Sequence, residues 1–161
     1  MNIYLLRHAE AEPGFPDHSR LLHASGREHA RRLGDFLRAK PAFQPTALWC
    51  SPFRRAQQTA ELLLESWGGS VDSRQDEARL EPEMNPAPLI EDLQQLGQDV
   101  LVVGHNPNIS ILASLLLSGE RARTRVHFNT AVMVCLQWDP IPNYGQFGPC
   151  ELDWMLDPRM I

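Results

Sequence analysis

Residues 100–103 read Val-Leu-Val-Val, an uninterrupted apolar run that is followed at once by Gly104 and His105. A strand with one solvated face would alternate apolar and polar residues, so this strand is expected to be buried on both faces. Strands of that kind occur in parallel sheets, because each parallel connection needs a crossover that is usually a helix. The run therefore favours an α/β fold.

Strand-like and helix-like patterns alternate along the rest of the chain. We expect strands at residues 2–6, 46–50, 70–73, 99–103, 126–138 and 151–156. We expect helices at residues 25–40, 52–67, 87–96 and 107–117. The last two strands, joined by the Pro/Gly-rich segment 140–149, are candidates for antiparallel pairing. The order predicts one domain over residues 1–161, a three-layer sandwich with a mostly parallel central sheet and helices on both faces.

Two helix starts carry capping patterns. Ser25 and Glu28 have the spacing of a capping box. Ser51-Pro52 would supply an N-cap and a proline at the first helical position.

Composition excludes several classes of function. The chain has 161 residues and a net charge of −5, so no overall positive field favours nucleic acid or an anionic membrane. Three scattered cysteines are too few for a disulfide framework or a Cys-x-x-Cys metal site. No apolar run is long enough to span a membrane, and no leader pattern precedes the first strand. These features predict a cytoplasmic protein.

Cationic side chains follow three of the predicted strands. The first strand ends in Arg7-His8, the second is followed by Arg54-Arg55, and the apolar run delivers His105. Ligands of open α/β sheets bind beyond the carboxyl ends of the strands, so these side chains should converge. Arg54 falls on the solvated face of its helix, whereas Arg55 sits near the helix N-terminus. A cation is unfavourable there unless it shares that end with a bound anion, which favours Arg55 as the site residue.

Two guanidinium groups and two imidazoles suit a phosphoryl group. Neither a Walker-type loop nor a G-x-G-x-x-G motif is present, and no acidic cluster is arranged for magnesium. A histidine can still act without metal, by attacking phosphorus with its neutral imidazole. A metal site built from His8, His105 and Glu10 is an alternative, although the ligand set is incomplete.

The stretches "LLRHAEAE", "SPFRRAQQT" and "VVGHNP", in that order, resemble the histidine phosphatase superfamily. The short chain is similar to its small SixA-type branch, the protein phosphohistidine phosphatases, and the resemblance covers nearly the whole chain. It implies a phosphoglycerate mutase-like fold and a hydrolase that needs no metal or cofactor. Ala9 stands where many members have glycine, and Leu21 and His23 depart from the usual Arg-Pro-Leu-Thr pattern of the next loop.

The resemblance also implies roles for individual residues. His8 would be the nucleophile that becomes transiently phosphorylated, while Arg7, Arg55 and His105 would hold the phosphoryl oxygens. Larger relatives use a carboxylic acid to protonate the leaving group. The candidates here are Glu81 and Glu83, of which the alignment favours Glu83, and both stay open.

His8 must be largely neutral in order to attack. A nearby cation lowers the pKa of an imidazole, and a hydrogen bond from its other ring N–H to a backbone carbonyl would fix the useful tautomer. We therefore expect Arg7 to have two functions: it binds phosphate, and it keeps His8 unprotonated.

Chain length bears on the substrate. About thirty residues separate Trp67 from Asp99, enough for one short strand and one helix but not for a lid. An open site should admit a phosphohistidine carried on a signalling or phosphotransfer protein. The alternatives are a small-molecule phosphatase that acts on a sugar phosphate or other metabolite, and a non-catalytic phosphate-binding module.

Overall fold

The computed structural model describes residues 1–139 and 149–161. The strands are β1 Asn2–Arg7, β2 Ala47–Cys50, β3 Ser73–Asp76, β4 Val100–Gly104, β5 Met133–Gln137 and β6 Glu151–Leu156. The helices are α1 Ala24–Arg38, α2 Arg54–Trp67, α3 Leu89–Leu96 and α4 Asn108–Ser118. Two short 3-10 turns, η1 Asp17–Ser19 and η2 Ala78–Leu80, complete the described elements.

The six strands form one sheet in the order β3-β2-β4-β1-β5-β6. Strands β3, β2, β4 and β1 pair in parallel, while β5 is antiparallel to β1 and to β6. The prediction of a mostly parallel sheet is confirmed, as is the antiparallel pairing of the last two strands. Arg7 is in register with Gly104, so the residues that follow β1 and β4 emerge side by side.

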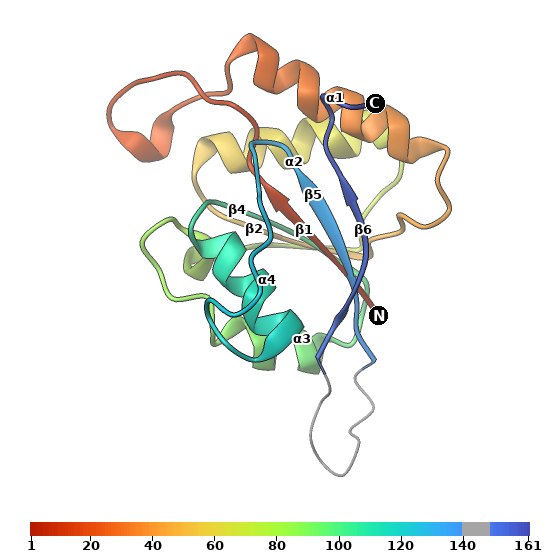
Figure 1. Ribbon diagram of the computed structural model, residues 1–161. Helices are drawn as coiled ribbons and strands as arrows, with labels where there is room; N and C mark the ends of the chain where they lie inside the picture. Colours follow the sequence, from red (N-terminus) through yellow and green to blue (C-terminus); the bar gives the residue numbers. More distant parts are fainter. Residues whose placement is uncertain (140–148) are drawn as a thin grey trace.

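Helices cover both faces of the sheet, which confirms the three-layer architecture (Figure 1). Tyr4 and Leu6 pack with the apolar faces of α1 and α2, whereas Ile3 and Leu5 pack with α3 and α4. Successive residues of β1 thus enter opposite cores, and β4 is fully buried in the same way. No helix in the described ranges is both long and apolar enough to cross a bilayer.

Both predicted helix caps were wrong. Helix α1 is capped by His23, whose side chain accepts a hydrogen bond from the Ser25 backbone N–H. Helix α2 begins at Arg54, two positions later than expected, after the N-cap residue Phe53. Ser51 is not the N-cap; its hydroxyl lies 2.8 Å from Nε2 of His105 and also accepts the Phe53 backbone N–H.

The bounds of two predicted strands also differ from those observed. The short third strand lies at Ser73–Asp76 instead of 70–73, and its four exposed side chains offer no apolar pattern that could fix the register. The long run 126–138 is a strand only over Met133–Gln137, because residues 126–131 form a loop over α4. Most of the predicted connection 140–149 lies outside the described residues.

A glycine sets the position of the long loop between β1 and α1. The side chain of any other residue at position 26 would overlap the backbone of Glu10, so only glycine lets α1 approach this closely. Ala11 bridges to Leu22 and the Glu12 N–H donates to the Leu21 carbonyl, which closes the loop at its base. The loop carries η1 toward the ends of the strands.

Candidate active site

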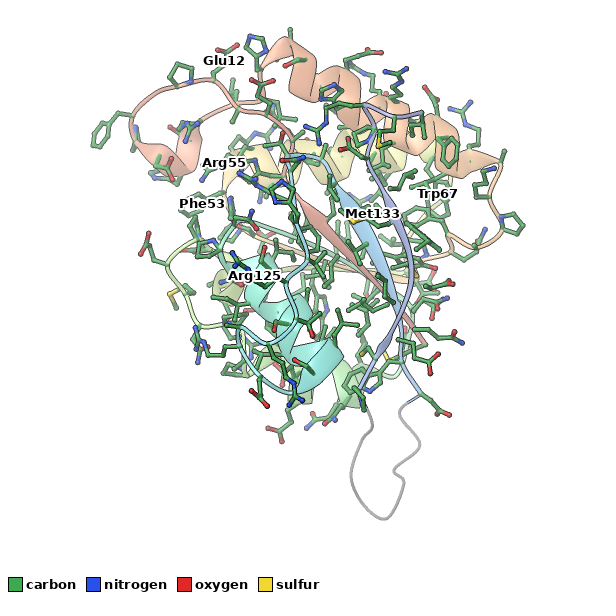
Figure 2. All side chains as sticks on the ribbon, in the orientation of Figure 1. Glu12, Phe53, Arg55, Trp67, Arg125 and Met133 are labelled. Carbon is green, nitrogen blue, oxygen red and sulfur yellow. The ribbon has the colours of Figure 1, made fainter. Side chains whose placement is uncertain are left out.

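The predicted residues converge at the carboxyl end of the parallel strands. The His8 backbone N–H donates to the Gly104 carbonyl over 2.9 Å, which ties the chain leaving β1 to the end of β4. The ring centroids of His8 and His105 are 4.8 Å apart. Figure 2 shows Arg55 and Phe53 near the end of β1 and far from Trp67, at the opposite end of α2.

The backbone fixes the tautomer of His8. Its Nδ1 lies 2.7 Å from the Ala9 carbonyl oxygen, which can only accept, so Nδ1 carries the proton. In the neutral ring Nε2 is therefore unprotonated. It accepts a long hydrogen bond, 3.4 Å, from Nε of Arg55. The lone pair that a nucleophile needs is thus on Nε2, beside a guanidinium group.

His8 is also held in its neutral form. Its pKa is lowered from 6.5 to about 4, mainly by burial; the hydrogen bond to Ala9 opposes this shift, and the nearby charges of Arg55 and Arg7 add to it. The expected effect of the arginines is present, but burial is the larger cause because a charged imidazole loses its hydration there.

Arg55 is 4% exposed even though it lies in the first turn of a helix. Its Nη1 donates to the backbone oxygen of Asp17 over 2.8 Å, and its Nη2 lies 3.1 Å from the Asp17 carboxylate. Arg54 instead is exposed and pairs weakly with Glu61 at 3.4 Å. The structure thus brings Arg55, and not Arg54, to His8.

Two buried polar atoms at the site have no hydrogen-bond partner among the described residues: Nε of Arg7 and Nδ1 of His105. Nη1 of Arg7 donates to the Phe128 carbonyl over 2.8 Å, which orients the guanidinium. Orphaned buried polar atoms are costly and rare in folded proteins. Their occurrence on two of the three residues predicted to hold phosphoryl oxygens is consistent with an anion-binding site.

His105 is oriented by Ser51. Its Nε2 lies 2.8 Å from the Ser51 hydroxyl, and both residues are fully buried. The Ser51 oxygen also receives the Phe53 backbone N–H at 3.3 Å. Burial, followed by the nearby charges of His8 and Arg55, lowers the pKa of His105 to about 2. His105 is therefore neutral when no anion is bound.

Thr59 joins the helix that carries Arg55 to the segment that carries His8. Its hydroxyl donates to the Arg55 carbonyl over 2.7 Å and accepts the Ala9 backbone N–H at 3.0 Å. Ala9 itself is fully buried in a small cluster with Leu22 and Ala30. The alanine at this position is thus accommodated by packing, with its backbone N–H satisfied.

The structure leaves the acid candidates beside the site but outside its hydrogen-bond network. Asn108, four residues beyond the end of β4, donates from Nδ2 to the carbonyls of Arg79, Glu81 and Met84 at 2.8–3.0 Å. This contact anchors the Glu81–Met84 loop to the start of α4. Glu83 is exposed, Glu81 is half-buried, and neither carboxylate makes a hydrogen bond within the described residues.

Glu10, the third member of the alternative metal site, has another role. Its carboxylate accepts the Ser25 hydroxyl, which ties the chain after β1 to the start of α1. In the described part of the chain no group of three His, Cys, Asp or Glu side chains is arranged to hold a metal.

Sequence reasoning missed three polar residues of the site. The sequence indicated a different role for Ser51, because a serine before a proline is typical of a helix start. Thr59 shares a helix face with Arg55 and could have been found by the four-residue spacing. Asp17 had no signal, because an exposed loop aspartate looks like any solvated residue.

Comparisons with known proteins agree with this geometry. Residues 3–84 match the family model for the histidine phosphatase superfamily (branch 1). The uncharacterized protein Rv1276c of Mycobacterium tuberculosis is 38% identical over 119 residues, which is 70% of each chain.

Solved structures show the same fold. The protein histidine phosphatase SixA complexed with tungstate superposes with a TM-score of 0.86 at 25% identity, over 99% of both chains. The mycobacterial glucosyl-3-phosphoglycerate phosphatase Rv2419c in complex with VO3 gives a TM-score of 0.70 at 19% identity, over 95% of this chain and 97% of the other. At that identity the second likeness shows the fold alone.

The chain therefore belongs to the histidine phosphatase superfamily, branch 1, as a SixA-type phosphatase.

Proposed function

We propose that this protein removes phosphate from phosphohistidine on a signalling or phosphotransfer protein, through a covalent intermediate on His8 and without a metal. The observation that carries the proposal is the state of His8. Its Nδ1–H is committed to the Ala9 carbonyl, so the neutral ring offers Nε2 as a nucleophile beside Arg55.

In the first step His8 Nε2 attacks phosphorus, and the bond from phosphorus to the substrate nitrogen breaks as the new P–N bond forms. The leaving nitrogen departs with the electron pair of that bond. A substrate imidazole that is protonated on its other ring nitrogen leaves as neutral imidazole and needs no acid, whereas a more basic leaving group must receive a proton. Water then attacks the phosphohistidine at position 8 and releases inorganic phosphate with Nε2 regenerated. In such transfers a protein acts mainly by positioning and by charge stabilisation.

The donors left over around His8 suit the three phosphoryl oxygens. A guanidinium group has five N–H donors, and Arg55 commits three of them to His8 and Asp17, which leaves two. Arg7 commits one to Phe128 and keeps its buried Nε–H. These groups would neutralise the charge that spreads over the oxygens in the transition state.

Ser51 would set the tautomer of His105. If the Ser51 hydroxyl donates to Nε2, the proton of the neutral His105 ring resides on Nδ1, the atom without a partner. Nδ1–H is then a hydrogen-bond donor for a phosphoryl oxygen. The opposite tautomer would present a lone pair to an anion, which is unfavourable.

The size of the segment between α2 and β4 supports a macromolecular substrate. Its helices and strands are only β3, η2 and α3, β3 pairs with the edge of the sheet, and the Glu81–Met84 loop is held to the start of α4, so no additional element of this segment forms a lid. An uncovered site can receive a histidine that projects from another protein.

Phosphate trapping tests the proposal. Incubation with a ³²P-phosphohistidine protein and rapid acid-free quenching should label the wild type but not His8→Ala, and the label should be stable to base and labile to acid. Activity should persist in excess chelator. Labelling of neither protein would indicate a non-catalytic phosphate-binding module, and much faster hydrolysis of a small phosphomonoester would overturn the proposed substrate.

Glu83 is proposed as the acid for substrates with a poor leaving group. Glu83→Gln should slow hydrolysis of an alkyl phosphate about 10²-fold, as expected for loss of a general acid, while phosphohistidine hydrolysis changes little. Glu81→Gln is the matched control in the same loop. Equal losses in both variants would remove Glu83 from this role.

A further inference from the structure

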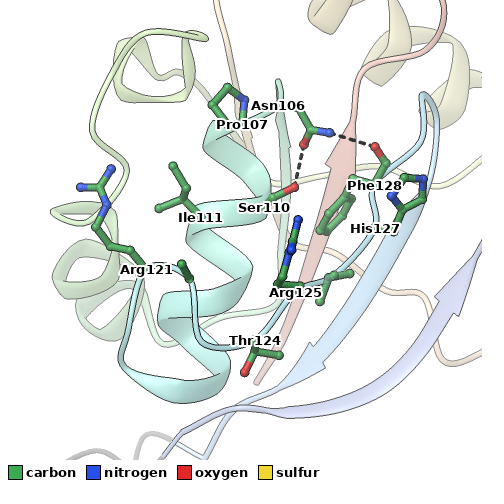
Figure 3. A pocket seen from close by; sticks show the side chains of 11 residues that line it. Asn106, Pro107, Ser110, Ile111, Arg121, Thr124, Arg125, His127 and Phe128 are labelled. Carbon is green, nitrogen blue, oxygen red and sulfur yellow. Dashed lines mark hydrogen bonds between the residues drawn. The ribbon is translucent and has the colours of Figure 1, made fainter.

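A basic groove adjoins the site. It has a volume of about 450 Å³ and is lined by residues 106, 107, 110 and 111 at the start of α4 and by residues 121, 122 and 124–128 of the loop before β5. Figure 3 shows Arg125 between α4 and Phe128, and Arg121 on the other side of α4. We call this feature the α4 groove.

The charge of the α4 groove is opposite to that of the whole protein. The chain has 20 acidic and 15 Lys or Arg residues, yet no described Asp or Glu lines the groove, whereas Arg121, Arg125 and His127 do. The lining loop reads RARTRVHF, with three arginines and no carboxylate. A local positive field of this kind attracts anions despite a net charge of −5.

The arginines of the groove are available to a ligand. Arg125 is exposed and makes no hydrogen bond or ion pair with the described residues, and Arg121 donates only to the neutral amide of Asn85 at 3.2 Å. Arg123, which lies between them in the sequence, does not line the groove and pairs with Glu120 at 2.8 Å. Neither groove arginine is thus neutralised by a carboxylate within residues 1–139 and 149–161.

One residue separates the groove from the phosphate site. The Phe128 carbonyl accepts Nη1 of Arg7 at 2.8 Å on one side and Nδ2 of Asn106 at 2.9 Å on the other. Asn106 in turn accepts the Ser110 hydroxyl at 2.8 Å within the groove wall (Figure 3). The α4 groove is thus a surface into which residues that flank a phosphoryl group at His8 can extend.

We propose that the α4 groove binds an acidic segment next to the phosphohistidine of the substrate protein, with Arg121 and Arg125 pairing its carboxylates. The inference rests on the proposed function and adds a specificity element to it. A protein segment fits better than a small anion, because Pro107, Ile111 and Val126 give the groove an apolar wall beside its cations. Such a wall can cover the stems and backbone of a peptide.

Steady-state kinetics test whether acidic residues beside the phosphohistidine improve the use of a substrate. Two synthetic peptides carry one phosphohistidine each, flanked by glutamates in one and by glutamines in the other. For the wild type, kcat/KM should be about tenfold higher for the glutamate peptide, through KM, and this advantage should shrink as salt rises. Arg121→Ala/Arg125→Ala should abolish the advantage, whereas Arg123→Ala, the matched control, should keep it. Activity on p-nitrophenyl phosphate should be the same in all these proteins.

A binding measurement separates the groove from the reaction. Fluorescence anisotropy with the unphosphorylated glutamate peptide needs no turnover, and the double variant should bind it about tenfold more weakly than wild type or Arg123→Ala. If this binding pattern is observed but phosphohistidine is not hydrolysed, the groove proposal is supported and the proposed function is overturned. If phosphohistidine is hydrolysed but neither KM nor binding depends on the glutamates or on Arg121 and Arg125, the groove proposal is overturned. An equal loss in Arg123→Ala would also overturn it.

Discussion

His8 shows how one side chain can be tuned by its surroundings without any acidic partner. Burial lowers its affinity for a proton, the adjacent arginines act in the same direction, and a single backbone carbonyl selects the tautomer. A carboxylate orienter, as in serine protease triads, would stabilise the cation instead. The arrangement favours a histidine that attacks as a free base.

This tuning predicts an unusual acid limit for activity. Since the folded pKa of His8 is about 4, kcat/KM should stay nearly constant as pH falls from 7 to 5 and decline only near pH 4. The measurement is a pH profile of kcat/KM with p-nitrophenyl phosphate, whose own ionisation is corrected for. An acid limb centred near 6.5 would show that the imidazole is not shielded as described.

Ser51 offers a second prediction at the scale of single residues. Ser51→Ala should lower kcat about tenfold, because the His105 proton would then be free to occupy Nε2 instead of Nδ1. Ser51→Thr keeps the hydroxyl and should restore part of the rate. The ¹⁵N chemical shifts of the His105 ring report the tautomer directly, and an unchanged tautomer in Ser51→Ala would contradict the positioning role.

At the scale of elements, apolar periodicity predicted which segments become strands and helices but not where each one ends. The buried strand at 100–104 and the amphipathic helices carried clear patterns, so their existence and order were predictable. Polar contacts made across the fold decided the ends. Helix α2 starts at Arg54, and Ser51 instead contacts His105, a residue 54 positions away, which no local pattern reports.

The site was predictable to the same extent. Arg7, His8 and His105 could be placed because strand ends meet at one edge of a parallel sheet. Arg55 was identified by its position near a helix N-terminus. Asp17 was not, since it reaches Arg55 through a loop whose path is determined by close packing at Gly26.

That packing yields a prediction for the element that begins at α1. In Gly26→Ala the new methyl group would overlap the Glu10 backbone, which should cost about 1–3 kcal/mol of unfolding free energy as overpacking and shift the loop that carries Asp17. Gly14→Ala is the control, because its methyl group would meet only Cγ of Arg20 at an ordinary 3.6 Å. Urea unfolding of the two variants measures the difference. Equal stabilities would contradict the close approach.

For the whole molecule, two histidines held neutral in one buried site link folding to pH. In the unfolded chain both would titrate near 6.5, whereas in the folded protein the pKa values are about 4 for His8 and about 2 for His105. Above pH 6.5 neither state binds these protons, so stability from this source is fully present. As pH falls from 6.5 toward 4 the unfolded state gains protons that the folded state does not, and stability is lost.

The expected slope approaches about 1.4 kcal/mol per pH unit for each histidine. Urea unfolding at pH 6.5, 5.5 and 5.0 should show the wild type losing stability along this slope, with His105→Asn losing roughly half as much over the same range. The comparison uses slopes and not absolute stabilities, so a variant that is uniformly less stable remains informative. Carboxylates titrate mostly below this window, which leaves the imidazoles to dominate it. Identical slopes in the two proteins would mean that His105 takes up its proton in the folded state, and its assignment as a neutral donor to a phosphoryl oxygen would then fail.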